Sequence, residues 1–435
     1  MYRESQLKAL FEGCRILIAG YGREGRSSER LIRQLLPEAD ITVVEGNDNI
    51  KAEAAKGYDL IMKSPGIPTF VFENADGGFL CNPDTITSQT DIFLQIYGGQ
   101  TVGVTGTKGK STTTNLIAAI VRRHTSDTIM AGNMGIPLFD VIPQIEADTV
   151  VVCEFSCHQL ENIHRAPHIA VLLNLFQEHL DHYHSYRDYQ MAKLQVGLRQ
   201  REGDTFFYCA DNAALAALVD EERAGMRGIV KAYSLRDPLA ERLSKVERRL
   251  QGDHNLSNLV VAYMVAAALG VDEAVVLDTI ATFQGLEHRL ELVGTYDGIT
   301  FYNDSISTIP EACMAAVGAL KEVDTLILGG FDRGIDYSGL GTFLAQSAIG
   351  NLVFVGAAGV RIHNAYRQAA DELGKPVEAR HVLVESDYGK IVPWCKVHTA
   401  KGKVCLLSPA AASYDAFKNF EERGRVFKSL VKADN

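Results

Sequence analysis

The chain has 435 residues and a formal net charge of −11, from 43 Lys and Arg residues against 54 Asp and Glu residues. This length exceeds what one hydrophobic core usually serves, so two or three domains are expected. The acidic balance argues against a nucleic acid or an anionic membrane as partner. No apolar run approaches the roughly 20 residues of a membrane span, and the first residues do not resemble a secretory signal. The eight cysteines are scattered without a C-x-x-C pair, so we expect free thiols in a cytoplasmic protein.

The first hundred residues follow a βαβ pattern. A strand at 15–19 leads into the turn Gly20-Tyr-Gly-Arg-Glu-Gly25, and a helix and a second strand follow before Glu45. G-x-G-x-x-G in this setting, with an acidic residue about twenty positions on, is typical of a dinucleotide site. The same element can hold a UDP group, and the pattern does not choose between them. A further strand at 59–63 ends in a rigid turn that begins at Ser64, at the strand edge where α/β sheets bind ligands.

Residues 101–114, Thr-Val-Gly-Val-Thr-Gly-Thr-Lys-Gly-Lys-Ser-Thr-Thr-Thr, predict a strand, a glycine-rich turn and a helix. Gly106 and Gly109 let backbone N–H groups approach phosphate oxygens, Lys110 can place a charge between two phosphates, and Ser111 offers a hydroxyl to magnesium. The strict Walker pattern fails because its first glycine stands one place too early. The strand before the turn and the apolar helix after it still indicate an ATP site.

Short apolar strands alternate with helices through the rest of the chain, which predicts parallel sheets covered on both faces. This pattern includes strands at 351–355 and 381–384, a charged helical stretch at 239–250 and a last helix that begins near Asp415. We therefore expect an α/β protein with three domains. The first is a Rossmann-like UDP-binding domain, the second a P-loop-type ATP-binding domain with a mostly parallel sheet, and the third a Rossmann-like amino-acid-binding domain. Their predicted ranges are 1–98, 99–290 and 291–435.

Two polar residues follow successive strands of the predicted central domain. Glu154 directly follows the strand at 148–153 and His179 comes after the strand at 169–174, and because the carboxyl ends of parallel strands meet at one edge, both can face the phosphate turn. Together with the Ser111 hydroxyl and ATP oxygens they could hold magnesium. The pattern H-x-x-H-x-H formed by His179, His182 and His184 also permits zinc, but no local cysteine or fourth ligand supports that alternative.

Several motifs together resemble the Mur ligases, the ATP-dependent amide-bond-forming ligases of peptidoglycan precursor synthesis. They occur in the family's order along almost the whole chain: G-T-K-G-K-S-T at 106–112, Glu154, N-x-x-x-x-H-L-D ending at Asp181, H-N-x-x-N at 254–258, H-R at 288–289 and N-D-S at 303–305. The closing segment 407–424 resembles the members that add glutamate to UDP-N-acetylmuramoyl-L-alanine. The first glycine turn and Ser64-Pro-Gly66 match their uridine-binding domain, so the resemblance favours UDP over a nicotinamide dinucleotide.

The resemblance implies a role for residues in each domain. Catalysis would depend on Lys110, Glu154, His179 and Lys193, and Lys193 matches a lysine that is carbamylated in the family. Two Mg²⁺ ions would be held by Ser111, Glu154, His179 and the carbamylated Lys193. ATP would be bound by Gly106, Thr107, Lys108, Gly109, Lys110, Ser111, Thr112, Asn255, Asn258, Arg289 and Asp304. The UDP-substrate would be bound by Gly22, Arg23, Glu24, Glu45, Ser64, Asn133 and His179, and glutamate by Arg333, Ser413, Tyr414 and Phe420.

Two positions depart from the pattern of the D-glutamate enzymes. Ile306 replaces the lysine of D-S-K, and Arg333 replaces a lysine after the later glycine pair. An arginine can bind a carboxylate through two parallel hydrogen bonds, so Arg333 can take over recognition, but L-glutamate or another acidic amino acid stays open.

Three other classes remain as alternatives to this ligase. A folylpolyglutamate-synthase-like ligase would begin near the phosphate loop, whereas about a hundred residues precede it here. An ATP-binding scaffold subunit would not need the catalytic set. A nicotinamide oxidoreductase would leave the ATP loop unused. We expect a monomer acting on small-molecule substrates.

Overall fold

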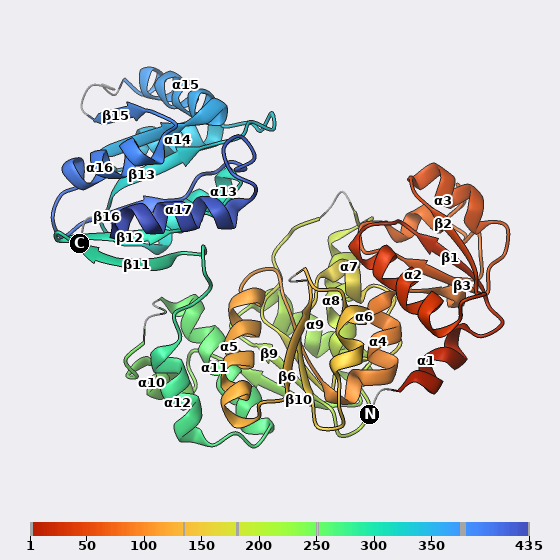
Figure 1. Ribbon diagram of the computed structural model, residues 1–435. Coiled ribbons are helices and arrows are strands. Elements are labelled where there is room, and N and C mark those ends of the chain that lie inside the picture. Colours follow the sequence, from red (N-terminus) through yellow and green to blue (C-terminus); the bar gives the residue numbers. More distant parts are fainter. Residues whose placement is uncertain are drawn as a thin grey trace. The chain divides into compact units, whose positions relative to one another are not determined.

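The computed structural model describes residues 3–133, 135–179, 182–248, 250, 252–374 and 380–433. The chain forms two compact units, Met1–Phe283 and Gln284–Asn435, and contains three β-sheets (Figure 1). The predicted three-domain α/β class is thereby confirmed, while the domain boundaries at 98/99 and 290/291 stay predictions. Over the described ranges no helix is long and apolar enough to cross a membrane.

The N-terminal part of the first unit is a four-stranded parallel sheet in the order β2-β1-β3-β4. The glycine turn links β1 to α2, as the sequence predicts, and Gly22 directly precedes the helix. The strands are β1 Arg15–Ala19, β2 Asp40–Val44, β3 Leu60–Lys63 and β4 Ile86–Thr87. The helices are α1 Glu4–Phe11, α2 Arg23–Leu35, α3 Asn47–Ala54 and α4 Gln89–Tyr97.

The central part of the same unit is a six-stranded, wholly parallel sheet in the order β10-β9-β8-β5-β7-β6. From β5 the chain passes to β6 at the sheet edge, returns to β7 beside β5, and then continues with β8, β9 and β10 on the other side of β5. Because the chain changes sides next to β5, the crevice for a ligand lies at the carboxyl end of β5. The strands are β5 Thr101–Thr105, β6 Thr128–Gly132, β7 Val150–Glu154, β8 Ile169–Leu172, β9 Thr205–Cys209 and β10 Ile229–Tyr233. The helices are α5 Lys110–His124, α6 Leu138–Val141, α7 Cys157–Leu160, α8 Tyr186–Leu198, α9 Ala213–Glu222, α10 Pro238–Ser244, α11 Asp253–Ala268 and α12 Glu273–Thr282.

The second unit is a six-stranded sheet in the order β11-β12-β16-β13-β14-β15, in which only the pairing of β11 with β12 is antiparallel. One hydrophobic cluster includes residues of α14 and α15 and a second includes residues of α16 and α17, so helices cover both faces. The strands are β11 Glu291–Tyr296, β12 Ile299–Asn303, β13 Val323–Gly329, β14 Asn351–Val355, β15 His381–Val384 and β16 Val404–Leu407. The helices are α13 Pro310–Ala319, α14 Ser338–Gln346, α15 Gly356–Glu372, α16 Tyr388–His398 and α17 Phe420–Lys432.

Two predicted helix boundaries are wrong for local reasons. The charged stretch 239–250 is helical only to Ser244, because the Arg248 guanidinium donates to the terminal carbonyls of Leu243 and Ser244. The last helix begins at Phe420 instead of near Asp415, because the Asn419 side chain accepts a hydrogen bond from the Glu422 N–H and caps the helix there.

Candidate active site

The residues between β5 and α5 form the predicted phosphate loop. Gly109 precedes α5 with φ of 86°, and a Cβ at this position would lie 2.9 Å from Asn258 Oδ1. Only glycine fits this left-handed, closely packed position. The Lys110 ammonium donates to the carbonyl oxygens of Gly106, at 3.0 Å, and Thr107, at 2.9 Å. The loop therefore combines a lysine charge with the N-terminus of a fifteen-residue helix, which is the arrangement that binds phosphate.

The segment after β8 fastens this loop. Asn174 accepts a hydrogen bond from the Lys108 N–H at 2.8 Å and donates to the Lys108 carbonyl at 3.0 Å. The Thr107 hydroxyl lies 2.7 Å from the Tyr189 hydroxyl and accepts from the Phe176 N–H at 2.9 Å. These contacts fix the loop backbone before any ligand is bound, so its shape is preorganised.

Lys193 of α8 lies in the centre of this region and is 2% exposed. Its ammonium donates to the Gly106 carbonyl at 3.0 Å, the same oxygen that Lys110 contacts. Burial lowers the pKa of Lys193 to about 8, and the Lys110 charge adds to this lowering. A buried lysine with an enlarged neutral fraction is able to react with carbon dioxide, whereas a surface lysine is almost wholly protonated near neutral pH.

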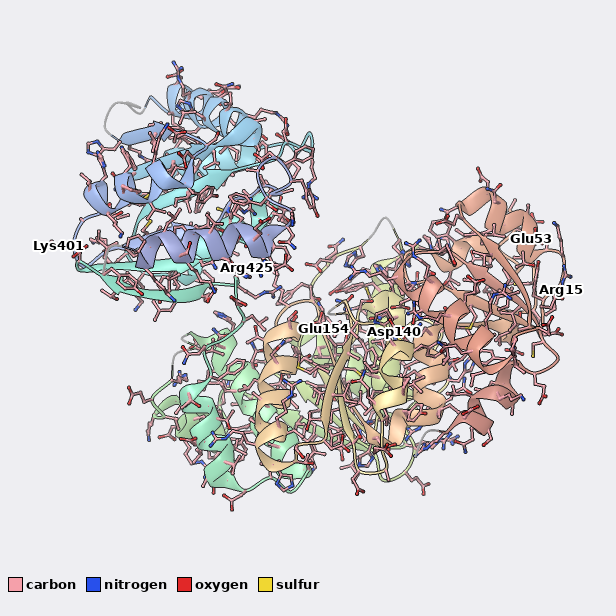
Figure 2. The ribbon with its side chains drawn as sticks, in the orientation of Figure 1. Arg15, Glu53, Asp140, Glu154, Lys401 and Arg425 are labelled. Atoms are coloured by element: carbon pink, nitrogen blue, oxygen red, sulfur yellow. The ribbon has the colours of Figure 1, made fainter. Side chains whose placement is uncertain are left out.

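Glu154 ends β7 at the carboxyl edge of the central sheet (Figure 2) and is 3% exposed. One carboxylate oxygen accepts from the Asn133 side chain at 2.7 Å, so two predicted site residues meet. The other oxygen, Oε2, is buried and has no hydrogen-bond partner among the residues that the structure describes. Since a buried carboxylate oxygen is costly to leave unpaired, this atom is suited to a cation.

His179 follows β8 with a φ of 58° in the left-handed region, which is strained for a residue that carries a side chain. Its ring centroid lies 4.8 Å from that of His158 and 6.2 Å from that of Tyr189. Leu180 and Asp181 of the same motif lie outside the described residues. The structure therefore gathers Lys110, Glu154, His179 and Lys193 around the carboxyl ends of β5, β7 and β8.

The other two histidines of the H-x-x-H-x-H pattern bind carboxylates. His182 Nε2 lies 2.7 Å from Glu161 Oε1, and His184 Nε2 lies 3.1 Å from Glu73 Oε2. A zinc site built from His179, His182 and His184 is not supported, because these two rings are engaged elsewhere.

A buried ionic network joins the N-terminal and central parts of the first unit. Lys63 Nζ lies 2.7 Å from Glu161 Oε2, and the two side chains are 1% and 7% exposed. Burial alone would raise the pKa of Glu161, but the hydrogen bond to His182 and the Lys63 charge outweigh it and lower that pKa to about 2. Thr69 also donates to the same oxygen at 3.0 Å. The network fixes the first sheet against α7 and the loop that follows β8.

The residues predicted for the UDP-substrate lie at the carboxyl edge of the first sheet and beside it. Ser64 donates to the Gly20 carbonyl at 2.8 Å, and Arg23 donates to the Gly135 carbonyl at 3.3 Å, next to Asn133. Gly22 directly precedes α2, and Glu45 directly follows β2 and is exposed.

Glu24 is half-buried, unlike the exposed Gly22 and Arg23, and its side chain contacts α7. Its carboxylate accepts from the Gln159 side chain at 2.8 Å, and burial raises its pKa. The carboxylate therefore points toward the central part of the unit, and its role toward a UDP group remains a prediction.

The two asparagines predicted near adenine are on the first turns of α11. Asn258 is buried against Gly109 of the phosphate loop, and Asn255 is half-buried one turn earlier. The start of α11 thus lies beside the phosphate loop, and contact of either asparagine with nucleotide stays a prediction.

The remaining predicted residues belong to the second unit. Asp304 is 2% exposed, its Oδ1 accepts from the Leu290 N–H at 3.1 Å and its Oδ2 accepts from the Ser408 hydroxyl at 2.7 Å. Burial raises the pKa of Asp304. These bonds hold the segment that carries the exposed Arg289, so Asp304 positions that segment; contact of either residue with nucleotide is a prediction.

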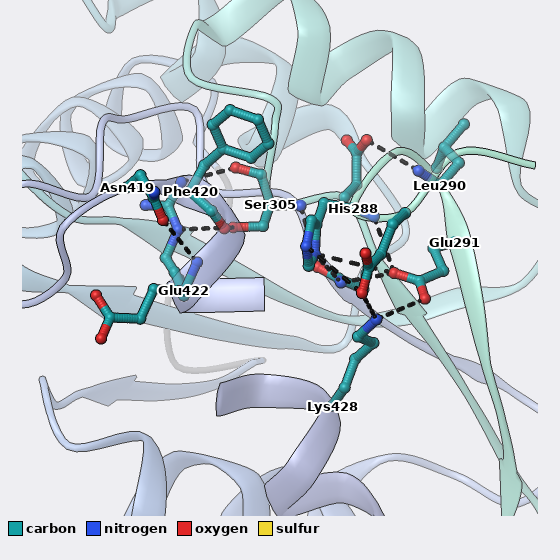
Figure 3. A network of polar contacts seen from close by, with 12 residues as sticks. His288, Leu290, Glu291, Ser305, Asn419, Phe420, Glu422 and Lys428 are labelled. Carbon is teal, nitrogen blue, oxygen red and sulfur yellow. Dashed lines mark hydrogen bonds and ion pairs between the residues drawn. The ribbon is translucent and has the colours of Figure 1, made fainter. Parts of the chain in front are cut away.

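A second network holds residues 284–290, the linker that begins the second unit before β11 (Figure 3). His288 is buried, and its Nδ1 lies 2.9 Å from Asn303 Nδ2, which also donates to Glu291 at 2.9 Å. Lys428 of α17 donates to Glu287 at 2.5 Å and to Glu291 at 2.8 Å. Linker, β12 and α17 are therefore held as one piece.

The predicted amino-acid residues gather near the ends of β13 and β16. Ser413 is buried, whereas Tyr414 is 66% exposed and packs edge-on against Phe331 with ring centroids 6.3 Å apart. Arg333 is exposed on the loop after β13, and Phe420 begins α17.

The Arg423 guanidinium supports these loops from within. It is 1% exposed and donates to the Ser305 hydroxyl at 3.0 Å and to the Ser305 carbonyl at 2.8 Å. It also donates to the carbonyls of Ala411 and Ala412 at 3.1 Å. One buried side chain thus connects the N-D-S motif with the loop that carries Ser413.

The sequence prediction missed several residues that shape the site. Asn174 follows β8 by two residues and begins the histidine motif, and Tyr189 lies one helical turn before Lys193, so their positions offered some signal. Cys157, His158 and Arg423 offered little, because their environments depend on long-range packing.

Comparison with known proteins identifies the family of this chain. The family model described as Mur ligase middle domain matches residues 104–266. A UDP-N-acetylmuramoylalanine--D-glutamate ligase from Symbiobacterium thermophilum is 33% identical over an alignment of 398 positions, which covers 88% of this chain and 85% of that protein. The chain therefore belongs to the Mur ligase family, and the resemblance seen in the sequence is confirmed.

One further relative and one solved structure are also similar to this chain. A UDP-N-acetylmuramoyl-L-alanine--L-glutamate ligase from Xanthomonas campestris pv. campestris is 31% identical over an alignment of 453 positions, which covers 97% of this chain and 96% of that protein. A crystal structure of MurF from Acinetobacter baumannii matches 99% of both chains with a TM-score of 0.59 at 13% identity. The latter likeness establishes the fold.

Proposed function

We propose that the protein is an ATP-dependent ligase that adds D-glutamate to UDP-N-acetylmuramoyl-L-alanine during peptidoglycan precursor synthesis. The observation that carries the proposal is the shared position of Lys110 and Lys193 on the Gly106 carbonyl, with Glu154 also acting electrostatically on Lys193. A phosphate loop beside a buried lysine and an unpaired carboxylate oxygen is suited to phosphoryl transfer, which requires positioning and charge neutralisation more than covalent catalysis.

The side chains of the first unit divide the work. Lys110 and the N–H groups at the start of α5 would bind and orient the triphosphate, and Asn258 would limit the nucleotide pocket. The donor set formed by Ser111, Glu154, His179 and a carbamylated Lys193 fits hard divalent cations, so two Mg²⁺ ions are proposed there. Bound Mg²⁺ would supply charge neutralisation at the transferred phosphoryl group.

The reaction would proceed through an acyl phosphate. The alanyl carboxylate of the UDP-substrate attacks the γ-phosphate of ATP, and ADP leaves. The amine of glutamate then attacks the activated acyl carbon through a tetrahedral intermediate, loses a proton and displaces phosphate. Arg333, Ser413, Tyr414 and Phe420 would select the amino acid, and Gly22, Arg23, Glu24, Glu45, Ser64 and Asn133 would bind the UDP-substrate.

A phosphate-release assay tests the proposal. Purified protein with ATP, Mg²⁺ and UDP-N-acetylmuramoyl-L-alanine should release phosphate only after D-glutamate is added, and mass spectrometry should detect the amide product. L-glutamate and D-aspartate provide the competing arms, because Ile306 and Arg333 depart from the D-glutamate pattern and one full-length relative is named for L-glutamate. Release with L-glutamate alone would reassign the amino acid, and no release with any amino acid would contradict the ligase proposal.

We also propose that the protein acts as a monomer in the cytoplasm and contributes through peptidoglycan to cell-wall biogenesis, cell shape and cell division. Size-exclusion chromatography with light scattering at assay concentration tests the monomer, for which the expected mass is 47.6 kDa.

A further inference from the structure

Three side chains next to the catalytic edge form a ligand set unlike that of a magnesium site. Cys157, His158 and His179 each offer one donor atom, and these three atoms lie within 4.8 Å of one another. Cys157 and His158 begin α7 just after β7, whereas His179 follows β8. The carboxyl ends of β7 and β8, which lie on either side of β5, therefore bring a thiol and two imidazoles together.

His158 is oriented toward this cluster and has a donor atom available. Its ring centroid lies 4.8 Å from that of His179. Its Nε2 atom is buried and lacks a hydrogen-bond partner within the described part of the chain. His182 also packs against it, with ring centroids 4.0 Å apart, but His182 Nε2 is bound to Glu161. The three candidate ligand atoms are therefore the Cys157 sulfur and one ring nitrogen each of His158 and His179.

This chemistry selects a different metal from the one proposed for catalysis. Mg²⁺ prefers oxygen ligands in octahedral geometry, whereas one thiolate and two imidazoles are ligands of Zn²⁺, with a fourth position left for water or a substrate oxygen. We propose that Cys157, His158 and His179 bind Zn²⁺, and that binding displaces the Cys157 thiol proton to solvent as the sulfur–zinc bond forms.

Zinc at this position would inhibit the enzyme. His179 is a member of the proposed magnesium set, so a zinc ion that binds it withdraws it from the catalytic centre. This consequence rests on the proposed function, whereas zinc binding itself does not. The site makes the ligase sensitive to thiophilic divalent cations through two residues, Cys157 and His158, that have no assigned part in catalysis.

Direct metal binding tests the site without any activity assay. Chelator-treated full-length protein under reducing conditions is titrated with Zn²⁺ against a chromophoric zinc indicator. One equivalent should bind, and Cys157→Ser and His158→Gln should each weaken binding at least about tenfold, as expected when a ligand is lost. Cys81→Ser is the matched control, since Cys81 is a half-buried free thiol in the first sheet domain, and it should bind zinc like the unchanged protein.

Cobalt substitution identifies the ligands and guards against misfolded variants. Co²⁺ bound to the unchanged protein should give a thiolate-to-metal charge-transfer band that is absent in Cys157→Ser. No stoichiometric zinc binding, or equal affinity in Cys157→Ser and the unchanged protein, would overturn the site. If the variants fail to fold, the absence of the charge-transfer band in the unchanged protein overturns it equally.

An activity arm then tests inhibition separately. With saturating Mg²⁺, substoichiometric Zn²⁺ should leave activity in proportion to unoccupied sites, chelator should restore it, and Cys157→Ser should need at least about tenfold more zinc for the same loss. Zinc binding without inhibition would refute the inhibitory role and leave the metal site intact. If no ligase activity exists, the proposed function fails while the binding result still decides the site.

Discussion

The phosphate-loop region of the first unit and the linker region of the second unit differ in how fully their buried charged groups are hydrogen-bonded. The buried Lys193 ammonium donates to a neutral carbonyl, and burial lowers its pKa. One buried carboxylate oxygen of Glu154 has no hydrogen-bond partner among the described residues. In the second unit both oxygens of Asp304 have donors, and Arg423 donates to four different acceptors. The unpaired groups near the phosphate loop lower stability and can bind a ligand, whereas the hydrogen-bonded groups of the second unit hold its loops in place.

The largest expected effect is on activity, at the phosphate loop. Lys110→Met should reduce phosphate release by at least about 100-fold, because it removes a preorganised positive charge from the phosphoryl-transfer site. The thermal unfolding temperature should change little, since the Lys110 ammonium donates to the loop carbonyls of Gly106 and Thr107. Lys245→Met, at a side chain that is 72% exposed just after α10, is the control. Full activity in Lys110→Met would remove the loop from the mechanism.

The buried network between the two parts of the first unit should show the largest effect on stability. Lys63→Met leaves Glu161 buried without its charge partner, which should lower the free energy of unfolding by about 3–5 kcal/mol. The exposed pair Lys245–Glu241, 72% exposed on both sides, is the matched control, and Lys245→Met should cost less than about 1 kcal/mol. If urea unfolding shows an equal loss of unfolding free energy in the two variants, burial does not determine how much an ion pair stabilises this protein.

The same network gives a pH dependence with a defined sign. The Glu161 pKa is about 2 in the folded state, below its ordinary value near 4.5. Its contribution is therefore complete above about pH 4.5 and is lost as the pH falls toward 2. The stability difference between the unchanged protein and Glu161→Gln should narrow over that window. A difference that stays constant from pH 7 to pH 3 would contradict the low pKa.

Lys193 should also make stability rise with pH, but in a higher pH range and because burial disfavours its charged form. Its folded-state pKa of about 8 lies below the ordinary value of 10.5, so the unfolded chain binds more protons between these values. Stability should rise from pH 8 to pH 10.5 by on the order of 3 kcal/mol relative to Lys193→Met. In the same protein, ¹³C-bicarbonate should give a carbamate NMR signal that Lys193→Met lacks. A flat pH difference would place the ammonium in a solvated environment.

Local patterns in the sequence predicted the parts of the fold that depend on neighbours along the chain. The phosphate loop, the strands at 15–19, 351–355 and 381–384, and the strand ends that carry Glu154 all follow from a few consecutive residues. Strands β6, β10 and β11 were missed because their side chains are largely half-buried or exposed and lack an apolar run.

The site was harder to predict where it depends on distant residues. Lys193 reads as a surface helix lysine because nothing around it in sequence indicates burial beneath Gly106, 87 positions earlier. Lys63 and Glu161 are 98 positions apart, and no local rule pairs them. Neither was the approach of His158 to His179 predictable, since it requires the lateral order of β7, β5 and β8 in the sheet.

The smallest expected effect concerns Gly424 in the second unit, and its control should change stability in the opposite direction. A Cβ at Gly424 would lie 2.2 Å from His288 Nδ1 and 2.9 Å from Asn303 Nδ2, so Gly424→Ala must displace the linker network and should cost about 1–3 kcal/mol. A Cβ at Gly339, near the start of α14, would meet nothing within 4 Å, so Gly339→Ala should be neutral or stabilise by up to about 1 kcal/mol. If both substitutions change the free energy of unfolding equally in urea, the packing of Gly424 against the linker network does not stabilise the second unit.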